Sequence, residues 1–175
     1  MTTAKHRSAG FTLIELVVVI SILAILAAFA LPRFAELSDQ AHDASIQGTA
    51  GALAAGVALV KTQWVANGLT TEADNVEGFG NDRVNVSAEG WPTSTTVDNN
   101  SPNMNASRCQ QVWLGVLQGN APSVVGATPD YDVTVQGDVD GNEPGDDCLF
   151  TYQLDGEGSS IGYDADTGEV TTVIN

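Results

Sequence analysis

Glu15 is a carboxylate within a long apolar stretch, where a charge is energetically unfavourable. Glu15 lies near the start of an apolar run from Phe11 to Leu31, in which only Thr12 and Ser21 are otherwise polar. An ionised acid at the centre of a membrane-spanning helix costs roughly 2.5 to 3.5 kcal/mol on insertion scales, so such residues tend to be functional and to have a partner. A positive counter-charge would offset that cost and would favour one stagger between packed helices. Glu15 is therefore a candidate for setting the register of helix packing.

A second group of possible ligands lies near the end of the chain. In the stretch DVDGNE, Asp138, Asp140 and Asn142 have the spacing with which a calcium loop begins. An EF-hand loop would also need Gly where Glu143 stands and a bidentate Glu where Leu149 stands. The pattern is thus compatible with an irregular calcium site or with a solvated acidic turn, and calcium is the one cofactor that the sequence suggests.

Groups for catalysis are sparse. His42 is the only histidine beyond the first ten residues, and no G-x-S-x-G motif, metal-spaced histidine set or phosphate-binding loop accompanies it. We therefore expect His42 to be a surface or subunit-contact residue rather than a catalytic base. The sequence does not predict an enzyme.

The apolar run from Phe11 to Leu31 has the length of a membrane span. A helix of about 20 residues is roughly 30 Å long, which matches the hydrocarbon core of a bilayer. Basic residues at positions 5–7 precede the run and only Arg33 closely follows it, so the positive-inside tendency puts the N-terminus in the cytoplasm. The sequence thus predicts export of the remainder, which is long enough for one domain with a modest core.

Export decides how the two cysteines are interpreted. Cys109 and Cys148 are far from CxxC spacing, and in an exported protein a disulfide is favoured over a metal or redox pair. The chain-entropy model gives roughly 4 kcal/mol for closing a loop of about 40 residues. Two unpaired buried thiols are the alternative.

The charge of the chain excludes one class of partner. There are 22 acidic residues against six Lys and Arg, which gives a formal net charge of −16. Nucleic-acid binding requires clustered Lys and Arg, so no nucleic acid is expected as a partner. The acidity indicates a soluble face or a surface that binds divalent cations.

The helical pattern continues beyond the apolar run. We expect one helix from about Phe11 to Val65, with a bend or local unwinding at Pro32, which lacks a backbone donor. Two apolar stripes follow different faces of its second half. One stripe comprises Ile46, Ala50, Leu53, Val57, Val60 and Trp64, and the other comprises Phe34, Leu37, Ala41, Ala44, Gly48, Ala52, Ala55 and Leu59. One stripe can pack on the chain's own sheet, and the other predicts an interface.

Period-two patterns predict a small sheet after the helix. Residues 67–107 read as a long surface connection with a short strand at 83–86, and residues 110–117 could be helix or strand. Alternation at 131–135 and 149–154 predicts strands, and 160–163 with 169–174 predicts a hairpin. The expected fold class is α+β, a long N-terminal helix packed on a small antiparallel sheet.

GFTLIE, at residues 10–15, carries a family resemblance. A short basic leader ending in Gly10, then Phe11, Glu15 and an apolar run broken by Pro32 resembles the class III signal of type IV pilins. The helix sequence and the C-x-x-V-W-L stretch are most similar to the mannose-sensitive haemagglutinin type of pilin. The resemblance implies a type IV pilin fold with a variable disulfide-bonded end.

The resemblance also implies a processing and assembly pathway. Prepilin peptidase would cleave between Gly10 and Phe11 and methylate Phe11, and Glu15 would pair with the N-terminal amine of a neighbouring subunit. The expected parts are a leader at 1–10, a membrane and filament-core helix at 11–33 that ends beyond Pro32, an amphipathic helix at 34–66, and a head at 67–175 containing the loop 109–148. The expected partners are other copies of the chain, the pilus assembly platform, minor pilins and the inner membrane. The mature form would be an extracellular fibre for adhesion, aggregation, biofilm formation or motility.

Other functions stay open at this point. A type II secretion pseudopilin or a minor pilin would share the N-terminal signature, although the Tyr-Pro-Thr motif usual after a pseudopilin helix is absent. An ordinary secreted domain cleaved after Ala30, or an uncleaved anchored domain, is a further alternative. A secretion signal would have a shorter apolar core without an acid, and an uncleaved anchor would leave Glu15 and the second stripe without a purpose.

Overall fold

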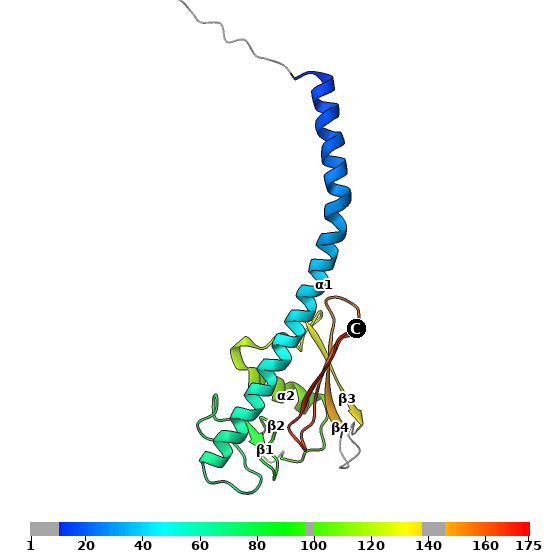
Figure 1. Cartoon of the computed structure of the whole chain (residues 1–175). Helices are drawn as coiled ribbons and strands as arrows, with labels where there is room; N and C mark the ends of the chain where they lie inside the picture. Colours follow the sequence, from blue (N-terminus) through cyan, green and yellow to red (C-terminus); the bar gives the residue numbers. More distant parts are fainter. Residues whose placement is uncertain (1–10, 97–99, 138–145) are drawn as a thin grey trace, which may run out of the picture. The chain divides into compact units, whose positions relative to one another are not determined.

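The computed structural model describes residues 11–96, 100–137 and 146–175. In chain order the elements are α1 (Leu13–Ala66), β1 (Asn85–Val86), β2 (Pro92–Ser94), α2 (Ala106–Leu117), the 3-10 helix η1 (Gln118–Asn120), β3 (Tyr131–Gly137), β4 (Asp146–Tyr152), β5 (Ser160–Tyr163) and β6 (Val170–Val173) (Figure 1). The chain divides into two compact units, Met1–Ala41 and His42–Asn175. The α+β class expected from the sequence is confirmed.

The described part of the first unit is helical. α1 begins at Leu13 and is continuous through Pro32. Pro32 has no N–H, so the carbonyl of Ala28 loses its usual donor there. The helix nevertheless does not unwind at Pro32, because one missing hydrogen bond interrupts neither of the flanking helical turns.

In the second unit, one face of α1 is buried. The stripe predicted from the sequence, Ile46, Ala50, Leu53, Val57, Val60 and Trp64, is buried together with Gly56. The structure thus confirms that one of the two predicted stripes packs within the chain, and it is the stripe that begins at Ile46. The helix ends after Ala66, where Gly68 adopts a φ of 72° and its N–H donates to the carbonyl of Val65 at 3.0 Å.

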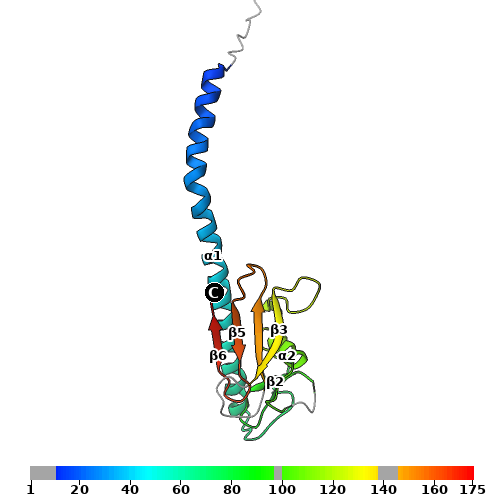
Figure 2. The ribbon, with the colours of Figure 1, turned by 90° about the vertical axis from the view of Figure 1, so that its right-hand side faces the viewer.

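The four-stranded antiparallel sheet has the order β3-β4-β5-β6 (Figure 2). In its register Tyr131 pairs with Tyr152, and Cys148 pairs with Tyr163. Both predicted strands and the terminal hairpin are present. In β3 Tyr131 and Val133 are buried whereas Asp132 and Thr134 are exposed, as expected for a strand with one face on the core.

Aromatic rings fill the core between α2 and the sheet. The Trp113 ring lies 4.3 Å from Phe150 and 5.0 Å from Tyr131, measured between centroids, and Tyr131 lies 5.1 Å from Tyr152. Trp113 Nε1 donates to the carbonyl of Pro122 at 2.9 Å, which satisfies its one polar group. The short apolar stretch that the sequence left undecided is therefore a helix, because its apolar side chains pack on the sheet.

A disulfide joins α2 to the sheet. Cys109 and Cys148 are bonded, with an S–S distance of 2.04 Å and a Cα–Cα distance of 5.5 Å. Both cysteines are fully buried. The bond fixes the helix to the second strand of the sheet and closes the loop expected from the sequence.

The segment between α1 and α2 differs from the expectation of a surface connection. Its polar residues Asn85, Thr93 and Ser94 are fully buried. The side chain of Asn85 accepts from the N–H of Asn75 at 2.9 Å and donates to Ser94 Oγ at 3.1 Å. Arg108, 4% exposed, donates from Nε to the carbonyl of Thr93 at 3.2 Å. Hydrogen bonding thus allows a polar segment to be folded into the unit.

Candidate functional site

The first turn of α1 holds Glu15 through a reciprocal set of hydrogen bonds. Thr12 precedes the helix, and its backbone N–H and its hydroxyl donate to Glu15 Oε2 at 2.8 and 2.7 Å. In return the N–H of Glu15 donates to Thr12 Oγ1 at 3.3 Å. This arrangement is a capping box, in which a residue pair at positions i and i+3 satisfies donors that the first helical turn leaves free.

Thr12 was missed in the interpretation of the sequence. The signal was present, since Thr-x-x-Glu directly before an apolar run is the capping-box signature. The capping box uses one carboxylate oxygen of Glu15. Within the described residues the other oxygen, Oε1, has no hydrogen-bond donor, so it can accept one from another molecule.

Basic groups that could neutralise Glu15 are absent from its surroundings in the described chain. Among the described residues, the ion pair that is present joins Arg33 and Glu36, about one helical turn apart, at 3.1 Å. Glu15 therefore accepts hydrogen bonds at Oε2 but has no counter-charge within the described residues. A counter-charge for it must come from outside the described residues.

The helix around Glu15 has an exposed apolar surface. Every residue from Phe11 to Leu31 is exposed except Ala30, which is half-buried. Phe11 is 87% exposed and Phe29 is 76% exposed. In the described residues this helix is the one that has the length and hydropathy to span a membrane. An apolar surface of this extent indicates contact with lipid, with another protein chain, or with both in turn.

Three glycines in the second half of α1 differ in whether the chain itself packs against them. A Cβ added at Gly56 would overlap Val116 on α2, so this glycine allows close approach within the chain. A Cβ added at Gly48 or Gly51 would have nothing within 4 Å. Glycine in a helix costs about 1 kcal/mol relative to Ala. The chain's own packing therefore explains Gly56 but not the other two.

Comparisons with known proteins agree with these features. Residues 5–31 match the family model of the prokaryotic N-terminal methylation motif. The chain is 39% identical over 103 residues to the type IV narrow pilus major component PilA5 of Thermus thermophilus. That match covers 59% of this chain and 79% of the relative. This chain belongs to the type IV pilins. No solved structure matches it significantly.

Membership in the type IV pilins settles several expectations. The long helix followed by an antiparallel sheet is the type IV pilin fold, and the family is structural rather than enzymatic. The family implies a membrane-anchored precursor, N-terminal processing and assembly into a homopolymeric extracellular pilus. The likeness to the mannose-sensitive haemagglutinin type is not tested by these matches.

His42 of this pilin contacts the sheet of its own chain. Its ring is half-buried, and its Nδ1 lies 2.9 Å from the hydroxyl of Tyr152 on β4. The half-buried ring is thus held against its own chain, and the expectation of a subunit contact stays a prediction. Burial raises the pKa of Tyr152 above its usual value, and the charges of Asp155 and Asp130 act in the same direction. The pair is a structural contact between α1 and the sheet.

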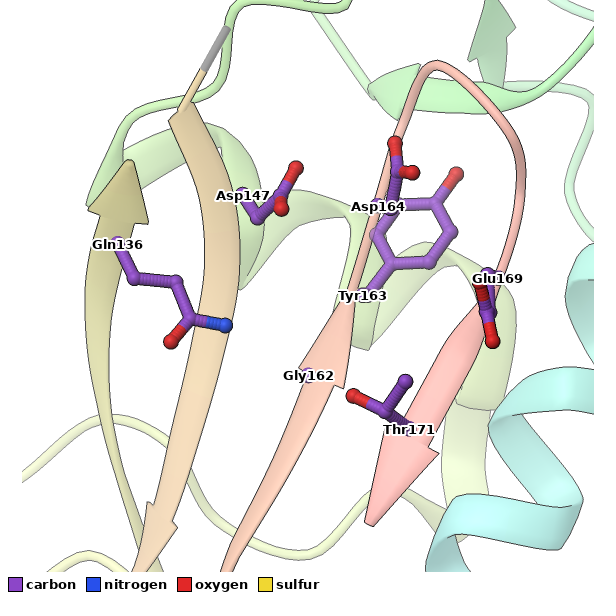
Figure 3. Close-up of a pocket in the computed structure, with 7 residues that line it drawn as sticks. All are labelled: Gln136, Asp147, Gly162, Tyr163, Asp164, Glu169 and Thr171. Atoms are coloured by element: carbon purple, nitrogen blue, oxygen red, sulfur yellow. The ribbon is translucent and has the colours of Figure 1, made fainter. Parts of the chain in front are cut away.

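A small acidic hollow lies on the sheet of the pilin (Figure 3). It measures about 50 Å³ and is lined by Gln136, Asp147, Gly162, Tyr163, Asp164, Glu169 and Thr171. Asp164 already accepts hydrogen bonds from the N–H groups of Asp166 and Thr167, at 2.7 and 3.2 Å. The hollow therefore has room for one or two water molecules and its carboxylates are partly used.

The predicted calcium ligands cannot be placed. Asp138, Asp140 and Asn142 lie outside the described residues. Within residues 11–96, 100–137 and 146–175 no group of three or more His, Cys, Asp or Glu side chains is arranged to hold a metal ion. Calcium binding thus has no structural support from the described part of the pilin.

Proposed function

We propose that this chain is a major pilin that polymerises through its Phe11–Leu31 segment into a surface fibre. Prepilin peptidase cleaves between Gly10 and Phe11 in this proposal and methylates the new amine. The observation that carries the proposal is the apolar surface of the segment, exposed along its length and interrupted by the acid Glu15. In a fibre this surface would be buried against the same segment of other copies.

Glu15 supplies the register of the proposed fibre. Cleavage before Phe11 creates a positive amine one residue before the capping box, and Oε1 of Glu15 has an unused acceptor position. An amine from a neighbouring copy would meet this oxygen only at one axial stagger. Removing one partner of a buried ion pair costs about 3 to 5 kcal/mol, so a slipped stagger would be strongly disfavoured. Pro32 removes one helical hydrogen bond and is the residue at which α1 would adapt its path in the fibre.

The proposed subunit class, uses and subtype of the fibre rest on the likeness to other pilins. A relative named as the major component of a narrow pilus supports a major rather than a minor subunit. Adhesion, aggregation, biofilm formation and motility are the proposed uses, and the assembly platform and minor pilins are the proposed partners. The mannose-sensitive haemagglutinin type remains the proposed subtype on the resemblance of the helix sequence.

A pair of acid-to-alanine variants tests the register role. Cells would produce Glu15→Ala or Glu36→Ala in place of the native chain, and fibres sheared from the surface would be weighed against total subunit. Glu36 is a matched control, because it is an exposed acid on the same helix that pairs with Arg33 within its own chain. We expect at least a tenfold loss of fibres for Glu15→Ala and near-native fibres for Glu36→Ala. Abundant fibres from Glu15→Ala would contradict the proposal.

Two further measurements separate the alternatives. The mass of the mature N-terminus distinguishes methylated Phe11 from a subunit that begins at Leu31. Microscopy at native expression distinguishes a pilin from a pseudopilin, since pseudopilins make short periplasmic assemblies. Long surface fibres of subunits that begin with methylated Phe11 are the expected result.

A further inference from the structure

Asn67 and Gly68 follow the last residue of α1 and form the one Asn-Gly pair in the sequence. The backbone nitrogen of the glycine in such a pair can attack the side-chain carbon Cγ of the asparagine, because glycine has no Cβ to hinder the approach. A bond forms between Gly68 N and Asn67 Cγ, the bond from Cγ to Nδ2 breaks, and Nδ2 leaves as ammonia with the proton that Gly68 N gives up. Water then opens the succinimide ring to aspartate or isoaspartate, so a carboxylate replaces a neutral amide.

Hydrogen bonds hold both reacting groups in other contacts in the folded chain. Asn67 Oδ1 accepts from Gln63 Nε2 at 2.9 Å, and Asn67 Nδ2 donates to the carbonyl of Glu77 at 2.8 Å. The N–H of Gly68 donates to the carbonyl of Val65 at 3.0 Å. The carboxamide cannot turn toward Gly68 N without breaking its own hydrogen bonds. The reaction therefore requires the end of α1 to open first.

The contact of Asn67 with Glu77 fastens the segment 69–79 to the end of α1. Val76 and Phe79 of this segment are buried, and Glu77 lies between them in the sequence. The side chain of Asn67 thus holds in place a segment whose apolar residues belong to the core of the second unit.

We propose that Asn67 is a deamidation site that the folded pilin keeps closed, and that its conversion releases the segment 69–79 irreversibly. The product carboxylate has no N–H, so the carbonyl of Glu77 would lose its donor. A negative charge at the C-terminal end of a helix is also unfavourable, and the segment already carries Glu72, Asp74 and Glu77. Because the native contact cannot form again, one local opening would have a permanent effect. All of these contacts lie within one chain, so the site does not depend on assembly into the proposed fibre.

Mass spectrometry of the full-length chain tests whether the fold closes the site. The chain would be incubated at mildly alkaline pH, either folded in detergent micelles or unfolded in guanidinium chloride, and then digested with trypsin. Cleavage after Lys61 and Arg83 gives one peptide that contains Asn67, and fragmentation assigns the conversion to this residue. Gln63→Ala removes the donor to Asn67 Oδ1, whereas the matched control Thr62→Ala changes an exposed neighbour whose hydroxyl donates within α1.

We expect Asn67 to convert at least tenfold more slowly in the folded chain than in the unfolded chain. Gln63→Ala should raise the folded rate at least threefold, and Thr62→Ala should leave it at the native value. Circular dichroism checks that both variants are folded. Equal rates in the folded and unfolded native chain would overturn the inference, as would a folded Gln63→Ala variant that converts at the native rate. Absence of conversion in the unfolded chain would also overturn it, because Asn67 would then not be a reactive site.

Aspartate variants test the effect of the conversion on the fold. Asn67→Asp introduces one product of the reaction, whereas Asn81→Asp adds the same charge at an exposed residue just beyond the segment. Amide hydrogen exchange within 69–79 should be at least fivefold faster in Asn67→Asp, and Asn81→Asp should exchange like the native chain. Native exchange in Asn67→Asp would overturn the proposed release of the segment.

Discussion

Thr12 and Glu15 cap each other at the start of α1, because the hydroxyl and N–H of Thr12 both donate to one oxygen of Glu15, at 2.7 and 2.8 Å. Glu15 thus has a partner within its own chain before any assembly. Its second oxygen and its charge are left for another copy. The same acid can therefore stabilise the isolated helix and set the register of the proposed fibre, through different atoms.

Loss of the capping hydroxyl should loosen the first turn of the helix. Thr12→Val keeps the shape of the side chain but removes the donor to Glu15, and loss of an N-terminal cap costs about 1 kcal/mol. Amide hydrogen exchange of the full chain in detergent micelles should show roughly fivefold faster exchange in the first helical turn. Thr12→Ser retains the hydroxyl and should exchange like the native chain. Native protection in Thr12→Val would show that the capping box is not formed.

Two glycine variants on one helix should change stability in opposite directions. Gly51→Ala adds a methyl group into open space, so it should stabilise the chain by about 1 kcal/mol through helix propensity. Gly56→Ala places its methyl group against Val116, so overpacking should destabilise the chain by about 1 to 3 kcal/mol. Thermal unfolding in micelles, followed by circular dichroism, measures both effects. A stabilising Gly56→Ala would mean that α1 and α2 do not pack as described.

Alkaline pH should unfold the second unit. All three tyrosines have a raised pKa, mainly because of burial, and Tyr163 is shifted most strongly. The Tyr163 hydroxyl donates to the carbonyl of Pro92 at 2.7 Å, and this bond requires the protonated form. A raised folded-state pKa means that the neutral form is favoured by folding. The resulting stability is complete below the unfolded tyrosine pKa near 10 and is lost as the pH rises above it.

Absorbance of tyrosinate measures this loss directly. A titration from pH 8 upward should show ionisation of the tyrosines at a pH above about 10, in the same step as the change in circular dichroism. Tyr163→Phe loses the hydrogen bond to Pro92, so it should be less stable at neutral pH but should lose less stability between neutral and alkaline pH. Tyrosines that all titrate near 10 without unfolding would contradict their burial.

Removal of the disulfide should lower the stability of the second unit but should leave its fold unchanged. The bond closes a separation of 39 residues, for which the chain-entropy model gives roughly 4 kcal/mol. The Cys109→Ser and Cys148→Ser double variant should lose several kcal/mol in denaturant unfolding, with a native circular dichroism spectrum in the absence of denaturant. Because both cysteines are fully buried, the native bond should resist mild reductant until the unit unfolds. Rapid reduction of the folded chain would contradict this burial.

The sequence predicted those elements of the pilin that depend on the pattern of residues within one segment. The buried stripe from Ile46 to Trp64 follows from helical periodicity, and the Tyr131 strand and the terminal hairpin follow from alternation. Glu15 was conspicuous because an acid in an apolar run has an energetic cost. Thr12 was missed although its spacing to Glu15 carries a known signature.

Other features depend on contacts between distant residues and could not be predicted. Asn85, Thr93 and Ser94 are polar and suggested a surface loop, but their hydrogen bonds to the same segment allow them to be buried. His42 contacts Tyr152 across 110 positions of sequence, so nothing near His42 indicates that partner.

A density map of the native fibre at side-chain resolution tests the central claim most directly. The account predicts that each Glu15 carboxylate lies within about 4 Å of the methylated amine of Phe11 of a neighbouring copy, inside a bundle of Phe11–Leu31 helices. A fibre in which Glu15 faces no amine, or in which the heads alone hold the subunits together, would contradict it.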